Sequence, residues 1–229
     1  MNTAQKKIYD HVEEVTLQIP VGRVILEGDL AVPPGAQSIV LFAHGSGSSR
    51  FSSRNRYVAR HLQREGLATL LFDLLTSAEE QVDSYSLRLR FDIGLLATRL
   101  SGATSWLKTQ KEMAKMTVGY FGASTGAAAA LIAENEHQSV VKAIVSRGGR
   151  PDLAGRALSL VKAPTLFIVG GIDYQVITLN EEAVEKVKTI KKLTIVPGAS
   201  HLFEEPGALE SVADLAAFWF SQYLKSPSA

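Results

Sequence analysis

The sequence predicts an α/β protein with a doubly wound, mostly parallel sheet of about eight strands and helices on both faces. Two observations support this prediction. Short apolar runs such as 39–43 and 68–72 lack alternating polar residues, which is typical of strands covered on both faces. Segments with helical periodicity separate these runs and are long enough for crossover connections. Because such crossovers are right-handed, successive strands are expected to lie parallel in one sheet.

The composition favours one globular domain over residues 1–229. Turn-forming residues are scattered along the chain without a linker or a repeat. The formal charge of +1 gives no indication of a nucleic-acid or membrane partner. Cysteine is absent, which excludes disulfides and thiolate ligands, and we expect no metal or cofactor. No apolar run has membrane-spanning length, and residues 1–10 lack the core of a signal peptide, so we expect a cytoplasmic protein.

The first half of the chain is expected to open with an antiparallel pair of strands, because the first run alternates and Pro33 ends the second. A polar loop is expected after Asp73, and apolar residues at helical spacing follow it. The expected elements are, in order, strands 15–19, 24–32 and 39–43, a helix over 54–65, a strand over 68–72 and a helix over 93–107.

The second half continues the alternation. Residues 178–181 resemble a capping box at the head of a helix, and Pro206 suits the first turn of the closing helix. The expected elements are strand 118–122 and the helix after it, strand 141–145, a short helix near 154–160, strand 164–169, a helix through 183–187, strand 193–196 and a helix over 206–219.

The most informative stretch is 118–131, an apolar strand-like run followed by Gly-x-Ser-x-Gly and a run of alanines. A tight turn from strand to helix lifts a serine hydroxyl clear of the sheet edge, where it can act as a nucleophile. Such a turn crowds the backbone, so Gly122 and Gly126 meet a need for space on either side of Ser124. The motif also occurs by chance in turns, but the strand before it and the helix after it favour catalysis.

An acid and a histidine are expected on the same edge of the sheet. Asp173 follows the seventh expected strand and His201 follows the eighth, and loops at the carboxyl ends of parallel strands gather functional groups. The order Ser124, Asp173, His201 is that of the α/β-hydrolases, with gaps that leave room for helical crossovers. These three residues are the predicted catalytic groups.

These motifs resemble those of α/β-hydrolases of the dienelactone-hydrolase-like group. The resemblance runs from about the first strand to the last helix and is most specific at 44–47, 122–126, 170–173 and 200–201. It implies the α/β-hydrolase fold and acyl-ester chemistry. Dienelactone hydrolases proper carry cysteine at the elbow, whereas this chain has Ser124, so their particular lactone hydrolysis is not implied.

The chemistry of the residues suggests how ester cleavage would proceed. His201 would take the Ser124 proton and return it to the leaving group, while Asp173 would hold the imidazole in the required tautomer. We assign the oxyanion hole to the backbone N–H groups of Ser46 and Thr125, where losing one donor costs about 3 kcal/mol. The expected partner is a small ester substrate, while the oligomeric state stays open.

Other residues at the strand ends have structural interpretations that we prefer. His44 is better placed to brace a glycine turn than to act as the base. Asp73 is the second choice for the acid but is expected to cap or brace its own loop. Asp152 is interpreted as a helix cap.

Two groups of arginines have different interpretations. The first group recurs every four residues on one helix, as on a solvated face, and consists of Arg56, Arg60 and Arg64. The second group lies on loops at the expected active edge, where guanidinium groups could pair with a substrate carboxylate, although each is somewhat more often an ordinary surface residue. It consists of Arg50, Arg54, Arg147 and Arg150.

Three alternative functions are weighed against an esterase. The 45–49 loop resembles a phosphate-binding turn but lacks the lysine of a P-loop and the third glycine of a dinucleotide fingerprint. A non-catalytic binding module on a hydrolase scaffold is possible because fold does not fix function. Peptide, thioester or lactone cleavage and acyl transfer would use the same triad. The short connection between Ser146 and Pro164 leaves no room for a large lid, which favours an open site for small esters.

Overall fold

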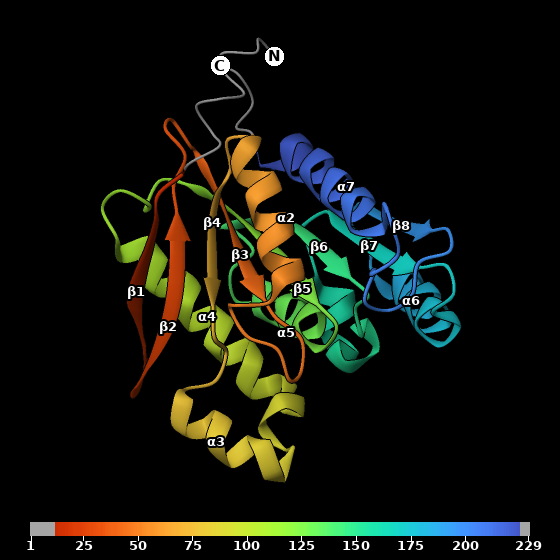
Figure 1. Cartoon of the computed structure of the whole chain (residues 1–229), viewed down its shortest axis with the longest axis horizontal. Coiled ribbons are helices and arrows are strands. Elements are labelled where there is room, and N and C mark those ends of the chain that lie inside the picture. The colour runs from red at the N-terminus through yellow and green to blue at the C-terminus, as the bar shows by residue number, and fades with distance from the viewer. Residues whose placement is uncertain (1–11, 225–229) are drawn as a thin grey trace.

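The computed structural model describes residues 12–224 and contains one eight-stranded sheet (Figure 1). The order across the sheet is β1-β2-β4-β3-β5-β6-β7-β8. The strands are β1 (Glu14–Val21), β2 (Val24–Ala31), β3 (Ser38–Ala43), β4 (Ala68–Phe72), β5 (Thr117–Ala123), β6 (Val141–Arg147), β7 (Thr165–Gly170) and β8 (Lys191–Val196).

The register confirms the predicted topology. β1 pairs with β2, and β2 with β4, in antiparallel fashion, whereas all pairs from β4 through β3 to β8 are parallel. The central strands β3 and β5 align Phe42 with Phe121. The carboxyl ends of β3, β5, β6, β7 and β8 therefore share one edge, which is where the predicted catalytic residues were expected.

Helices cover both faces of the sheet, as predicted for a doubly wound fold. α2 and α7 pack on one face, and α4, α5, η2 and α6 pack on the other (Figure 1). The helices are α2 (Ser53–Arg64), α3 (Ser77–Ser86), η1 (Leu89–Phe91), α4 (Ile93–Thr109), α5 (Thr125–Glu134), η2 (Pro151–Leu160), α6 (Tyr174–Lys186) and α7 (Ala208–Tyr223), of which η1 and η2 are 3-10 helices.

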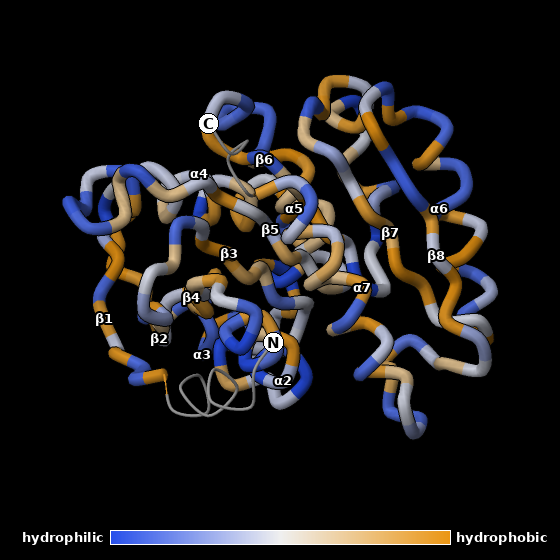
Figure 2. Tube along the Cα trace, turned by 90° about the horizontal axis from the view of Figure 1, so that it is seen from above, coloured by the Kyte–Doolittle hydropathy of each residue, from blue (hydrophilic) through white to orange (hydrophobic). Residues whose placement is uncertain are grey.

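The apolar strands build two cores, one on each face. On β3, Ile39 and Leu41 belong to the core under α4 and α5, while Val40 and Phe42 belong to the core under α2 and α7. Successive side chains of a strand point to opposite faces, so a strand buried on both sides must be apolar throughout. Figure 2 shows β3 and β7 as hydrophobic segments inside the molecule.

Three local expectations were wrong. The segment after Asp73 is not a simple polar loop, because it contains α3, whose capping box joins Thr76 and Glu79 through both side chains. The capping box expected at 178–181 does not exist, since α6 already begins at Tyr174. Pro206 precedes the closing helix instead of lying in its first turn, because α7 begins at Ala208.

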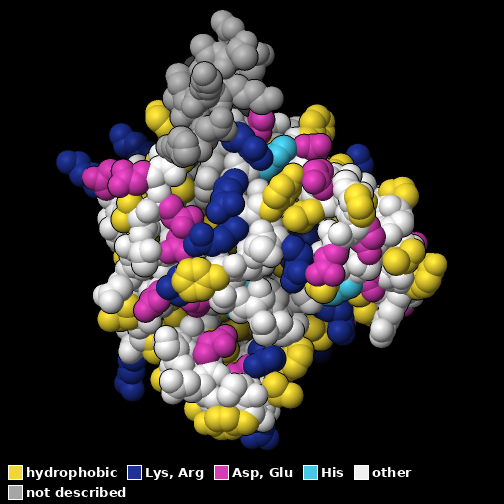
Figure 3. Space-filling model, in the orientation of Figure 1, with side chains coloured by type: hydrophobic (Ala, Val, Ile, Leu, Met, Phe, Trp, Pro, Cys, Tyr) yellow, Lys and Arg dark blue, Asp and Glu magenta, His cyan; other side chains and the backbone are white. Residues whose placement is uncertain are grey.

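Arg56 also departs from the expectation of a purely solvated arginine stripe. Its guanidinium donates to Asp29 at 2.7 Å and to Glu14 at 3.0 Å, and the Asp29 side chain is almost fully buried. This contact links α2 to the antiparallel end of the sheet. Figure 3 shows basic side chains over α2 beside acidic side chains on the neighbouring strands.

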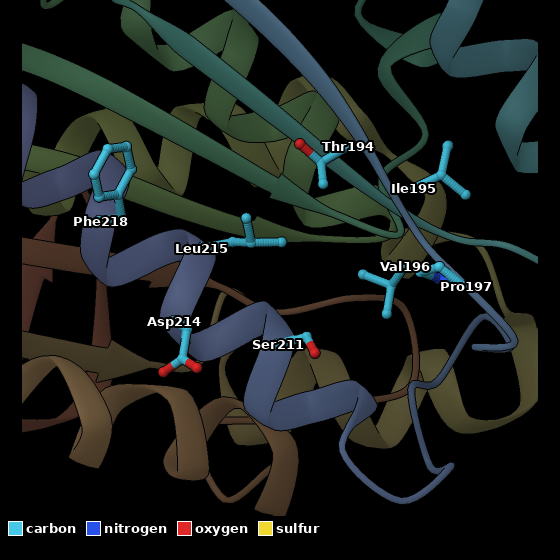
Figure 4. Close-up of a pocket in the computed structure, with 8 residues that line it drawn as sticks. All are labelled: Thr194, Ile195, Val196, Pro197, Ser211, Asp214, Leu215 and Phe218. Carbon is cyan, nitrogen blue, oxygen red and sulfur yellow. The ribbon is translucent and has the colours of Figure 1, made fainter.

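A groove of about 430 Å³ lies between the edge strand β8 and α7 (Figure 4). It is lined by Thr194, Ile195, Val196, Pro197, Ser211, Asp214, Leu215 and Phe218. None of these eight residues belongs to the predicted catalytic set. Among residues 12–224, no helix combines the length and the apolar character needed to cross a membrane.

Candidate active site

Ser124 occupies a strained turn between β5 and α5. β5 ends at Ala123 and α5 begins at Thr125, and Ser124 between them has φ 51° and ψ −120°. A positive φ is uncommon for a residue with a side chain and costs about 1–3 kcal/mol when the surrounding structure enforces it. The strand-turn-helix arrangement expected from the sequence therefore holds Ser124 in the conformation of a nucleophile elbow.

The glycines on either side of Ser124 occupy positions that have no space for a side chain. A Cβ on Gly126 would lie 2.1 Å from the carbonyl oxygen of Ala43, and a Cβ on Gly122 would lie 2.4 Å from Cα of Ala127. Both contacts are with backbone atoms, which cannot rotate away. The close approach of α5 to β3 and β5 therefore depends on these two residues.

The loop after β6 holds the elbow from one side. The Ser124 N–H donates to the carbonyl of Arg147 at 3.2 Å, and the Arg150 N–H donates to the carbonyl of Ser124 at 3.1 Å. From the other side, a Cβ on Gly45 would lie 3.0 Å from the Ser124 Cβ. The loops after β3 and β6 thus enclose Ser124 on both sides.

His201 and Asp173 form a hydrogen-bonded pair on the same edge. Nδ1 of His201 lies 2.7 Å from Oδ2 of Asp173. The Asp173 side chain is 15% exposed and the His201 side chain 39%, so the carboxylate lies beneath the imidazole. If Nδ1 carries the proton, Nε2 is left as the acceptor that a general base needs.

The position of Gly148 relates His201 to Ser124. A Cβ on Gly148 would lie 3.5 Å from Nδ1 and Cε1 of the His201 ring, and Gly148 itself has φ +51°. Gly148 lies within the 147–150 segment whose backbone bonds to Ser124. Ser124 and His201 therefore both contact one short segment of the chain, from opposite directions. The contact between the Ser124 hydroxyl and the His201 imidazole stays a prediction.

The two residues assigned to the oxyanion hole also lie beside Ser124. Thr125 is the first residue of α5, so its N–H has no acceptor within the helix. Ser46 directly follows Gly45, which touches the elbow. An N–H at the helix start and an N–H on the facing loop are the donors that a tetrahedral oxyanion needs.

His44 braces the loops around the site, as the sequence interpretation expected. Its side chain is buried, Nδ1 lies 3.0 Å from the Gly45 carbonyl, and the Leu74 N–H donates to Nε2 at 3.0 Å. Burial lowers the pKa of His44 and keeps the ring neutral. With both nitrogens engaged, His44 joins the loops after β3 and β4 and has no free atom with which to act as a base.

Asp73 likewise has a structural role. It accepts a hydrogen bond from the Arg50 N–H at 2.7 Å and forms an ion pair with the Arg50 guanidinium. Arg50 also pairs with Glu27 at 2.6 Å. The carboxylate therefore braces the loop after β3, and the same contacts occupy an arginine that the sequence offered as a substrate ligand.

Arg150 is also held by a carboxylate of its own, and this corrects the interpretation of Asp152. Asp152 accepts two hydrogen bonds from the Arg150 guanidinium, at 2.9 and 2.7 Å. Asp152 is therefore not a helix cap, since η2 has no side-chain cap and its first turn contains Asp152 itself. Two of the four arginines expected on loops lie elsewhere, because Arg54 belongs to α2 and Arg147 ends β6. Arg54 pairs with the exposed Glu204 at 3.1 Å, and Arg147 has no carboxylate partner among residues 12–224.

Arg90 is a residue near the site that the sequence analysis did not identify. Its guanidinium forms an ion pair with the buried Asp83, and it lies so close to Gly47 that a Cβ there would be 3.1 Å from Nη1. Arg90 and Glu80 also line a hollow of about 10 Å³ behind the 44–47 loop, which is too small for a substrate. The residues after Asp73 were expected to form a polar loop. The capping box of Thr76 and Glu79 is the sequence signal that indicates a helix there.

A model of the dienelactone hydrolase family matches residues 26–222 of the chain. The chain belongs to the dienelactone hydrolase family. A dienelactone hydrolase from Anabaena variabilis shares 60% identity with it, at a TM-score of 0.92, and the match covers 93% of this chain and 99% of that one. An esterase from Pyrococcus furiosus, at 18% identity and a TM-score of 0.73 over 98% and 95% of the two chains, shares the fold.

Two proteins from Mycobacterium tuberculosis, each named "Putative phosphoribosyl transferase", are also related. Each is 56% identical over 215 residues, which is 94% of this chain but 47% of the relative. This chain therefore spans about half the length of these relatives. Membership of the dienelactone hydrolase family and the Anabaena structure support hydrolase activity for the matched region.

Proposed function

We propose that this dienelactone hydrolase family member is a serine hydrolase that cleaves small carboxylic esters, lactones or thioesters through an acyl-enzyme. The observation that carries the proposal is the Asp173–His201 hydrogen bond at 2.7 Å beside an elbow that holds Ser124 at φ 51°. A half-buried serine at a strand-to-helix elbow, on the same sheet edge as an imidazole that a carboxylate orients, supports nucleophilic acyl transfer.

The reaction follows from the roles of these groups. Nε2 of His201 accepts the Ser124 proton while Oγ attacks the carbonyl carbon, and the carbonyl oxygen becomes an oxyanion near the N–H groups of Thr125 and Ser46. Collapse of this intermediate expels the alcohol, which takes the proton from His201. Water then attacks the acyl-enzyme by the same route and releases the acid.

The elbow serine sets a different requirement from the cysteine of dienelactone hydrolases proper. An alcohol is a weaker nucleophile than a thiol at neutral pH, because it has a much higher pKa and needs a base to remove its proton during attack. The Asp173–His201 pair supplies that base. For this reason the proposal concerns esters in general and does not carry over the lactone substrate of those enzymes.

The size of the connection after β6 supports a small substrate. Residues 148–164 contain η2 and no separate lid domain, and the His201 side chain is 39% exposed. An open site of this kind excludes little water and offers little apolar surface to a long acyl chain. We expect short acyl esters to be better substrates than long ones.

Labelling with a fluorophosphonate probe tests the proposal directly. The wild type is expected to be labelled, whereas Ser124→Ala and His201→Ala are expected to lose labelling and the hydrolysis of short p-nitrophenyl esters. Labelling that persists in Ser124→Ala would move the nucleophile to another residue. A folded wild-type protein without labelling or hydrolysis would favour the non-catalytic binding module.

Phosphoribosyl transfer is not part of the proposal. The transferase name belongs to proteins about twice as long as this chain. The 45–49 loop, which most resembles a phosphate-binding turn, packs against Ser124 and Arg90. Its contacts are those of a loop that shapes the ester site.

A further inference from the structure

Arg147 carries a buried positive charge without a carboxylate partner among residues 12–224. The residue ends β6 and is 7% exposed. Its Nη2 donates to Oδ1 of Asn55 at 3.3 Å, its guanidinium lies 5.8 Å from the centroid of the Phe203 ring, and its Nε has no hydrogen-bond partner in this part of the chain. Buried arginines are normally paired, because an isolated charge is costly to remove from water.

The charges around Arg147 do not compensate it. Burial and, to a smaller extent, the positive charge of Arg54 lower the pKa of Arg147 to about 10. Arg54 is itself only partly paired, because its Nε is buried without a partner and its Nη1 contacts Glu204 at 3.1 Å. The Glu204 side chain is 63% exposed, so solvent and salt weaken this ion pair and another anion can replace it.

The two guanidinium groups come from elements that meet at the active edge. Arg54 lies in the first turn of α2, where Ser52 is the N-cap, so the positive end of the helix dipole adds to the charge. The carbonyl of Arg147 accepts the Ser124 N–H, and Phe203 lies two residues after His201. The backbone of Arg147 is thus joined to the proposed nucleophile, and its guanidinium lies near the turn that follows the proposed base.

Phe203 shows that this arrangement is enforced by the fold. It has φ 57°, one of three positive values among the non-glycine residues that the structure describes, and its ring is fully buried. A bulky residue adopts this conformation only when its surroundings require it. The turn after His201 therefore brings an aromatic ring to the Arg147 guanidinium, where it partly offsets the unpaired charge.

We propose that Arg147 and Arg54 form an anion subsite that binds the carboxylate or phosphate group of an ester substrate. Anion binding itself depends only on the two arginines, whereas the assignment to a substrate rests on the proposed hydrolase function. A guanidinium group binds either oxyanion through paired hydrogen bonds. Arg50 and Arg150, which their own carboxylates occupy, are not part of the subsite.

Binding is tested without catalysis in the Ser124→Ala protein. Inorganic phosphate and succinate, compared with chloride at equal ionic strength, are expected to raise the Tm by about 3 °C or more at saturating concentration, because a ligand that binds only the folded state stabilises it. Adding Arg147→Met is expected to abolish the shift, and Arg147→Lys to restore part of it. The matched control is Arg60→Met, because Arg60 is an exposed arginine of α2, the helix that carries Arg54. This variant should keep the full Tm shift.

Activity distinguishes the two oxyanions and tests the assignment to substrate. The measured quantity is the ratio of kcat/KM for an anionic ester to kcat/KM for neutral ethyl butyrate, with monoethyl succinate as the carboxylate and ethyl 3-phosphonopropanoate as the phosphate analogue. Arg147→Met is expected to lower the ratio for the preferred anion about 10- to 100-fold, and Arg60→Met to leave it unchanged.

Several outcomes would overturn the subsite. Equal Tm shifts in the proteins with and without Arg147→Met would show that Arg147 binds no anion. Equal kcat/KM ratios would overturn the assignment of this anion to the substrate. If Arg147→Met does not fold, Arg54→Met is measured in the same way and must lower both readouts. Tm shifts that depend on Arg147 in a protein without fluorophosphonate labelling would support the subsite and refute the hydrolase, so the two proposals fail separately.

Discussion

Nδ1 of His201 lies 2.7 Å from Oδ2 of Asp173, and the backbone fixes this relationship between two loops. The Ile172 N–H donates to the Ala199 carbonyl at 3.0 Å, and the Gly171 N–H donates to the Val196 carbonyl at 2.8 Å. The loops after β7 and β8 are therefore joined immediately before each of the two functional side chains. The pair is preorganised, as a catalytic carboxylate and imidazole need to be.

Asp173→Asn tests whether this pair acts in catalysis. An amide can offer its N–H to Nδ1 and so favours the tautomer in which Nε2 carries the proton and is no longer a base. We expect kcat for a short p-nitrophenyl ester to fall about 10⁴-fold while the circular dichroism spectrum stays unchanged. Asp152→Asn removes a carboxylate from the same edge and should keep kcat within about threefold. Similar losses in both variants would contradict a specific role for Asp173.

Gly126→Ala tests the packing of the elbow. A Cβ there would lie 2.1 Å from the Ala43 carbonyl oxygen, so α5 would have to move away from β3. We expect the free energy of unfolding to fall by about 3 kcal/mol, measured by urea denaturation. Gly94→Ala in α4 is the control, since the nearest atom would be 3.5 Å away and alanine favours a helix by about 1 kcal/mol. Unchanged stability of Gly126→Ala would refute the close approach.

The sequence was sufficient for the parts of the fold that rest on continuous patterns. The buried strands were predictable because a strand covered on both faces must be apolar throughout, as β3 is. The positions of Asp173 and His201 followed because parallel strands bring their carboxyl ends to one edge. Their contact at 2.7 Å is consistent with that prediction, and it is a distance that no pattern in the sequence specifies.

The sequence failed where tertiary partners decide the role of a residue. Asp152 resembled a helix cap, but a neighbouring guanidinium, that of Arg150, competes for the carboxylate. Arg56 follows a surface spacing, and its buried partner Asp29 lies 27 positions away. The spacing of charges on a helix indicates which residues share a face, but not which other element covers that face. The unpaired burial of Arg147 was unpredictable for the same reason.

Ser146→Ala tests an unsatisfied hydroxyl near the site. Ser146 is fully buried in β6, and its Oγ has no hydrogen-bond partner among residues 12–224. Removing a buried hydroxyl that makes no hydrogen bond should raise the free energy of unfolding by about 1 kcal/mol. The comparison is Thr104→Val, which removes a hydroxyl bonded to Leu100 and Tyr120 and should lower the stability by about 1–2 kcal/mol. A loss of stability in Ser146→Ala would mean that the hydroxyl is bonded in solution.

Glu134→Gln tests a buried carboxyl at the end of α5. Its Oε1 accepts the N–H groups of Lys162 and Ala163 at 3.0 and 2.9 Å, and its Oε2 has no partner in the described part of the chain. Burial raises the pKa of Glu134 above 4.5, and the two N–H groups only partly oppose this. The folded state therefore favours the protonated form, so this group's contribution to stability is complete below about pH 4.5 and is lost as the pH rises through the folded pKa.

Glutamine keeps the acceptor for both N–H groups but carries no charge at any pH. The free energy of unfolding of Glu134→Gln should therefore increase relative to that of the wild type as the pH rises above 4.5. This difference between the two proteins should become constant above the folded pKa of Glu134. Urea denaturation between pH 4 and pH 8 measures this difference. Glu182→Gln, on an exposed part of α6, should show a small and constant difference. Parallel curves for the wild type and Glu134→Gln would show that burial does not perturb this carboxyl group.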